Sequence, residues 1–131
     1  MFRKDLVTAN IIEEHEMRQV NSKESMVQYL DKYLNEIFEI PDEIKIIKRD
    51  EKQLSLEIFG KYICFDYSNK EIEVRYTAVE NEEIYIGSII FDKNYSRPLW
   101  KNANGVVTKF NIREIENFFE NAFLSFEPIN S

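Results

Sequence analysis

Cysteine, histidine, glycine and proline are all scarce in this sequence of 131 residues, and each shortage excludes a class of site. The single cysteine, Cys64, cannot form an intramolecular disulfide, which is typical of a protein from a reducing compartment. The single histidine, His15, lacks a second histidine or a cysteine partner for zinc binding, Cys-His or Ser-His-Asp chemistry. The three glycines lie far apart and cannot form a glycine-rich phosphate loop. We therefore expect no catalytic residues, no metal site and no cofactor.

Long apolar runs are also missing. No stretch approaches the 18 or so apolar residues of a membrane span, and the first residues lead into no apolar signal core. With the single cysteine, this pattern predicts a cytoplasmic protein. The composition is nevertheless that of a folded chain, because 44% hydrophobic and 14% aromatic residues exclude intrinsic disorder. The length suits one α+β domain over 1–131.

The net charge of −7 is unevenly distributed. Residues 10–43 carry nine acidic and three basic side chains, and residues 54–92 carry eight and three. Residues 93–113 instead carry five basic side chains and no acidic one. An acidic body with one basic segment predicts electrostatic contact with a partner.

The stretch from Leu54 to Phe91 predicts an antiparallel β-meander, because apolar and polar residues alternate in three successive segments. Gly60-Lys61 fits the central pair of a type II′ turn, which would place Leu56 opposite Phe65. One face of the three strands would then be apolar throughout, and it would carry Leu54, Leu56, Ile58, Ile63, Phe65, Tyr67, Ile72, Val74 and Tyr76. The fourth strand, from Ile84 to Phe91, shows no clean alternation and is expected to be covered on both faces.

The second turn of the meander leaves two registers open. In one, Asp66 lies opposite Glu73, and in the other it lies opposite Glu71. Both place like charges across the ladder on the outer face, which destabilises the pair slightly. Glu57, Asp66 and Glu73 therefore form either a solvent-screened patch or an acidic spot that meets a basic partner. Cys64, on the same face, is either a small buried side chain or a reactive thiol.

Two amphipathic helices are expected, over 23–39 and 111–125, where apolar residues recur with helical spacing. Asn111 and Glu114 have the spacing of a capping box at the start of the second helix. Residues 1–20 form a weakly patterned N-terminal segment, interpreted as a helix with Leu6, Ala9, Ile12 and Val20 on one face.

A short strand over 44–48 is expected to enter the meander, and Asn104-Gly105 could close a minor hairpin. These elements predict a two-layer α+β fold. An antiparallel meander of four to five strands would be packed on one face by the N-terminal helical region and the C-terminal helix.

The basic loop region, residues 93–110, contains Tyr95, Arg97, Trp100 and Lys101. In one interpretation Leu99 and Trp100 fill the core while the cations stay in water. In the other, an exposed tryptophan beside arginine and lysine contacts an acidic protein surface or a nucleic-acid backbone. The overall negative charge would repel phosphates, so nucleic acid is the weaker option.

The sequence therefore favours a non-enzymatic cytosolic protein-binding module, such as an inhibitor, an immunity-type neutraliser or a small chaperone or adaptor. It would use an acidic surface toward a basic protein partner, and a homodimer through the outer sheet face is a further option. No membrane contact is expected. The alternative is a small-ligand-binding or enzymatic domain, with an aromatic pocket between sheet and helices lined by Tyr33, Tyr67, Tyr76 and Trp100.

Overall fold

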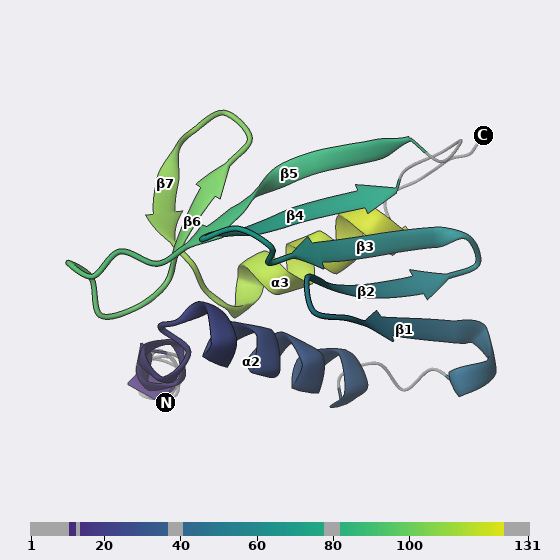
Figure 1. Cartoon of the computed structure of the whole chain (residues 1–131), viewed down its shortest axis with the longest axis horizontal. Coiled ribbons are helices and arrows are strands. Elements are labelled where there is room, and N and C mark those ends of the chain that lie inside the picture. The colour runs from purple at the N-terminus through teal and green to yellow at the C-terminus, as the bar shows by residue number, and fades with distance from the viewer. Residues whose placement is uncertain (1–10, 13, 37–40, 78–81, 125–131) are drawn as a thin grey trace, which may run out of the picture.

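The computed structural model describes residues 11–12, 14–36, 41–77 and 82–124 of the chain. Within them lies one antiparallel sheet of seven strands, in which each strand pairs with the next along the chain (Figure 1). The strands are β1 (Lys45–Arg49), β2 (Gln53–Ile58), β3 (Lys61–Asp66), β4 (Ile72–Thr77), β5 (Glu83–Ile90), β6 (Leu99–Asn102) and β7 (Val107–Lys109). The fold is therefore of the α+β class with an antiparallel sheet, as predicted.

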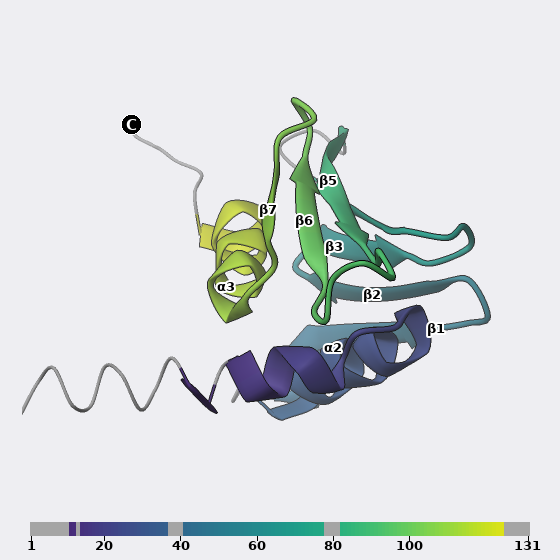
Figure 2. The ribbon, with the colours of Figure 1, turned by 90° about the vertical axis from the view of Figure 1, so that its left-hand side faces the viewer.

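The helical elements flank this sheet in the chain. Residues 11–12 and 14–19 are helical, and they are followed by α2 (Lys23–Glu36) and a short 3₁₀ turn, η1 (Asp42–Ile44). After β7 come α3 (Ile112–Phe119) and a π-helical segment, η3 (Glu120–Leu124). Figure 1 shows the sheet from the side opposite α3, and Figure 2 shows α2 and α3 as separate helices beside it.

One apolar cluster joins side chains from the helices and the strands. The ring of Phe118 in α3 lies 6.1 Å from Phe65 in β3 and 4.9 Å from Trp100 in β6. Met26, Leu30 and Leu34 of α2 are buried in the same cluster as Leu54, Leu56, Ile63, Phe65, Ile72 and Val74. The predicted inner face of the meander is therefore the core-facing side.

The prediction of four to five strands is wrong, because the described chain has seven. The predicted hairpin around Asn104-Gly105 exists as β6 and β7, and β6 pairs with β5, so the hairpin extends the main sheet. Periodicity cannot reveal these strands. β6 begins with two buried residues in succession, Leu99 and Trp100, and β7 is exposed throughout.

The register of the first hairpin also differs from the prediction. Ile58 pairs with Lys61 and Leu56 with Ile63, so the turn residues are Phe59 and Gly60. Both have positive φ, 51° and 81°, as a type I′ turn requires, and this turn matches the twist of the strands. A shift of two residues leaves every side chain on its predicted face, because side chains alternate with a period of two.

The second turn adopts one of the two registers left open, with Asp66 opposite Glu73. Beyond it, the irregular pattern of β5 has a simple cause. Val74 pairs with Gly87 and Arg75 with Tyr85, so Ile86 is the extra residue of a β-bulge. The bulge interrupts the alternation at Ile86, and the successive residues Gly87, Ser88 and Ile89 are all buried, so this part of β5 is covered on both faces as predicted.

The helix predictions hold in part. Asn111 caps α3, since its side chain accepts a hydrogen bond from the Glu114 amide at 3.3 Å. In the first helix Val20 is buried as expected, but Ile12 is 54% exposed and Met17 takes the core position. Leu6 and Ala9 lie outside the described residues, as do residues 37–39 of the helix expected over 23–39 and residue 125 of the helix expected over 111–125.

Candidate functional site

The outer face of the sheet carries the predicted acidic residues. Glu57, Asp66 and Glu73 alternate along their strands with the buried residues of the core, and Asp66 pairs directly with Glu73. Because side chains alternate across a strand, these carboxylates point away from the core. The structure thus brings Asp66 and Glu73 together and places Glu57 on the neighbouring strand.

Arg75 joins the two opposed carboxylates. Its guanidinium lies 3.2 Å from Asp66 Oδ2 and also forms an ion pair with Glu73. Asp66 further accepts hydrogen bonds from the amide of Ser68 at 3.0 Å and from its hydroxyl at 2.6 Å. The like charges predicted to repel each other across this ladder are therefore compensated by a single shared cation.

Burial by itself would raise the pKa of Asp66. The hydrogen bonds from Ser68 and the neighbouring Arg75 outweigh it, so the pKa lies below its ordinary value. The same carboxylates hold the pKa of Arg75 above its ordinary value, although burial acts in the opposite direction. The formal charges of the three side chains sum to −1.

Cys64 lies opposite Arg75, and its side chain is buried. Burial, reinforced by the charge of Asp66, raises the pKa of the thiol to about 11. A thiol with this pKa is almost entirely protonated at neutral pH and is a poor nucleophile. The structural interpretation of Cys64 therefore fits better than the reactive one.

Further carboxylates on this face have weaker partners. Glu57 lies 3.8 Å from Lys48, and Glu71 lies 3.7 Å from Lys101. Glu83 accepts a hydrogen bond from the Tyr62 hydroxyl at 2.8 Å. With the Arg75 cluster included, five carboxylates stand against three cations in these contacts, so the group carries a net charge of −2.

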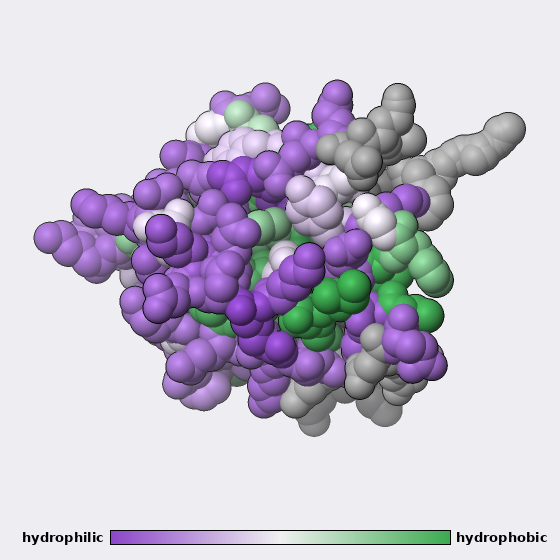
Figure 3. Space-filling view, turned by 45° about the vertical axis from the view of Figure 1, so that its right-hand side comes forward, coloured by the Kyte–Doolittle hydropathy of each residue, from purple (hydrophilic) through white to green (hydrophobic). Residues whose placement is uncertain are grey.

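Exposed apolar side chains adjoin these charges. Phe59 in the first hairpin turn is 80% exposed, Ile46 opposite Glu57 is 51% exposed, and Tyr85 opposite Arg75 is 40% exposed. Figure 3 shows apolar side chains gathered among hydrophilic ones on the right-hand side of the molecule as drawn in Figure 1, which comes forward in this view. Sequence reasoning missed Ile46 and Tyr85, although their positions opposite polar outer-face residues could have indicated them.

The basic segment is divided between core and surface. Trp100 and Arg97 are each only 8% exposed, whereas Tyr95 is 54% exposed. Arg97 forms an ion pair with Glu14 and donates to the carbonyl oxygen of Phe110. Of the two interpretations, the core-filling one describes Leu99 and Trp100, but its expectation that the cations stay in water is wrong for Arg97. Arg97 and Trp100 are thus buried, whereas the side chain of Lys101 is 38% exposed.

The four aromatic residues expected to line a pocket are engaged in packing. Tyr33 stacks on Phe119 with ring centroids 5.7 Å apart, and Tyr67 donates its hydroxyl to the carbonyl oxygen of Asp50 at 2.6 Å. Tyr76 packs against the apolar cluster, and the buried Trp100 belongs to it.

Other kinds of site find no support in the described part of the chain. His15 is exposed, and no cluster of histidine, cysteine and carboxylate side chains suited to a metal ion occurs among the described residues. Nor does any described helix combine the length and the apolar character needed to cross a membrane.

Comparison with known proteins finds no matching family model, no matching curated protein and no matching solved structure. The inference of function therefore depends on the surface of the chain itself.

Proposed function

We propose that this protein is a non-enzymatic binding module that contacts a basic protein partner through the outer face of its sheet. In this proposal α2 and α3 form one layer over the inner face, and the outer face is left for the partner. The observation that carries the proposal is the combination of outward carboxylates with exposed Ile46 on β1, Phe59 in the turn between β2 and β3, and Tyr85 on β5.

Charge determines which partner suits this face. Its contact group carries a net charge of −2, in a chain whose total is −7. A basic partner would be attracted over a distance of about 10 Å at 0.1 M salt, and complementary charges accelerate association. A second copy of the same chain would bring like charges together and is therefore the weaker candidate.

The apolar residues would supply the affinity. Interfaces typically have an apolar, aromatic centre inside a polar rim, and a few aromatic anchors contribute most of the binding energy. Phe59 projects from a turn with little cover, and Tyr85 lies beside the Arg75 cluster. Inhibitors, immunity-type neutralisers and small chaperones all fit this surface chemistry.

The test is capture of partners from native lysate by the immobilised full-length chain, followed by elution with a salt gradient. We expect a stoichiometric basic protein that elutes at moderate salt. The double variant Glu57→Lys with Glu83→Lys should abolish capture, because it reverses two charges of the proposed contact surface. It leaves the Asp66–Arg75–Glu73 cluster intact, so the fold should not change.

A matched control carries Glu16→Lys and Glu120→Lys, which change the net charge equally at exposed helical positions. This control should capture the partner as the unmodified chain does. Equal loss in both double variants would mean that only total charge matters, and capture that is insensitive to Glu57 and Glu83 would exclude this face. Sedimentation of the purified chain at two concentrations would reveal a homodimer, which would contradict a basic partner as the occupant.

A further inference from the structure

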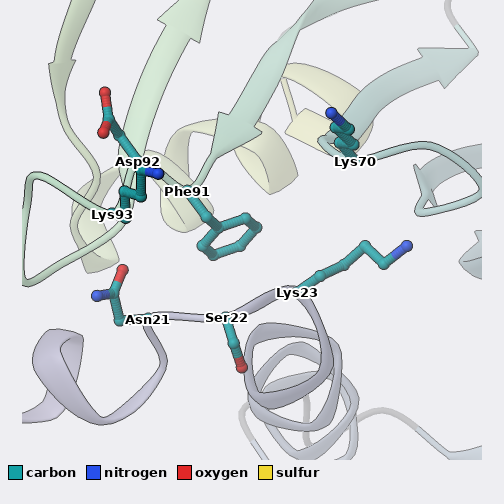
Figure 4. Close-up of a pocket in the computed structure, with 7 residues that line it drawn as sticks. All are labelled: Asn21, Ser22, Lys23, Lys70, Phe91, Asp92 and Lys93. Carbon is teal, nitrogen blue, oxygen red and sulfur yellow. The ribbon is translucent and has the colours of Figure 1, made fainter.

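A second surface feature lies at the other end of β3 from Phe59. Here the start of α2, the turn between β3 and β4, and the residues after β5 surround a cavity of about 300 Å³ (Figure 4). This volume is at the lower limit of the range for small-molecule sites. The segments that line it are far apart in the sequence, so the fold alone creates it.

The cavity is basic within an acidic protein. Lys23, Lys70 and Lys93 line it together with Asp92, and three positive charges against one negative leave +2. Lys23 Nζ donates to the carbonyl oxygen of Asn69 at 3.0 Å. Lys70 and Lys93 form no ion pair with any residue that the structure describes. Ammonium groups that outnumber the carboxylates around a concave site attract anions.

The remaining walls offer two further kinds of contact. The half-buried ring of Phe91 projects between the lysines and presents an apolar surface (Figure 4). Asn21 donates its amide Nδ2 to the carbonyl oxygen of Tyr95 at 3.2 Å, whereas its Oδ1 is buried and accepts no hydrogen bond from a described residue. Buried polar atoms are rarely left without a partner, and a hydroxyl group of a ligand would supply the missing donor.

We propose that this cavity binds a small phosphorylated metabolite. The phosphate would lie between Lys70 and Lys93, since lysine binds phosphate as a compact point charge. The apolar or flat part of the molecule would pack on Phe91. The site is separate from the outer sheet face, so it does not depend on the protein-binding proposal.

Calorimetric titration and thermal denaturation of the full chain at low ionic strength provide the test. The probes are pyrophosphate, AMP and adenosine. Pyrophosphate and AMP should bind and raise the melting temperature, because a ligand that binds only the native state stabilises it. Adenosine, which has no phosphate, should not bind. The double variant Lys70→Glu with Lys93→Glu should weaken AMP binding by at least about tenfold.

The control pair is Lys32→Glu with Lys109→Glu, two exposed lysines outside the cavity that give the same change in net charge. This pair should bind AMP as the unmodified chain does. Absence of pyrophosphate and AMP binding up to about 10 mM, or equal weakening in both pairs, would overturn the proposal. If the Lys70/Lys93 double variant fails to fold, Lys93→Gln alone keeps the test open and should weaken AMP binding by about threefold.

Discussion

The two faces of the β3–β4 ladder share one backbone but are stabilised by different forces. On the inner face Phe65 pairs with Val74 and both are fully buried, with the ring of Phe65 against that of Phe118 in α3. One residue further along, on the outer face, Asp66 pairs with Glu73 and both bind Arg75. The inner face depends on volume and shape, and the outer face on charge compensation. A sheet can therefore tolerate opposed carboxylates on one face while the apolar residues of the core lie on the other.

Removal of an inner-face ring should have the largest effect. Phe65→Ala deletes a buried ring that contacts Phe118, so the free energy of unfolding should fall by about 4 kcal/mol. The outer-face variant Glu57→Ala loses only an exposed ion pair and should change it by less than about 0.5 kcal/mol. Urea denaturation measures both. Similar losses in the two variants would mean that the faces do not differ as described.

A side chain added at Gly87, beside the bulge, should cause the second-largest loss in the free energy of unfolding. A Cβ atom on Gly87, which has φ of 153°, would lie 2.4 Å from Trp100 Cζ2 and 2.6 Å from the carbonyl oxygen of Lys101. Gly87→Ala should therefore cost about 3 kcal/mol, from backbone strain and overpacking together.

Gly60 offers the matched control. Its φ is also positive, at 81°, but a Cβ there would meet nothing within 4 Å. Gly60→Ala should cost only about 1 kcal/mol in the same denaturation experiment. Equal costs at the two glycines would show that backbone conformation alone, and not the contact with Trp100, determines the effect.

The stabilisation contributed by Asp66 on the outer face should depend on pH. The pKa of Asp66 is lower in the folded chain than its ordinary value of 3.8, so its ionised form stabilises the fold. This contribution is complete above pH 3.8 and is lost as the pH falls through the lower folded value. Asp66→Asn should thus cost about 1 to 2 kcal/mol at pH 7, and the difference from the unmodified chain should shrink as the pH falls below about 4.

Denaturation at a series of pH values between 7 and 3 measures this difference. Ser68→Ala removes one hydroxyl donor to Asp66 and should give a smaller loss with the same pH profile. A cost for Asp66→Asn that stays constant across the series would show that the charge of Asp66 is not what stabilises the cluster.

The inner face was predictable because burial repeats every second residue, and Leu54, Phe65 and Val74 follow that repeat. The register of the first hairpin was not, since it depends on Phe59 adopting a positive φ that glycine normally supplies. The bulge at Ile86 and the packing of Trp100 on Gly87 depend on strand pairing, which periodicity does not encode.

The acidic members of the candidate site were found from the sequence because their position in the alternation places them on the outer face. Their shared partner Arg75 lies on the same strand as Glu73. Whether it neutralises both carboxylates depends on the register of β3 and β4, which the sequence left open. The lysine cavity could not be predicted, because Lys23, Lys70 and Lys93 come together only through the tertiary fold.

The pairing of Arg97 with Glu14 has a consequence for any shortened form of the chain. The guanidinium is almost completely buried, and Glu14 is the acidic group with which it is paired. Deletion of the first twenty residues would leave the buried guanidinium of Arg97 without its counter-charge. The cost in folding free energy would be far greater than that of losing a few surface contacts. The helix that contains Glu14 thus supplies the counter-charge for Arg97, which is more than eighty residues away in the chain. The helix and the loop that carries Arg97 are best treated as one structural unit.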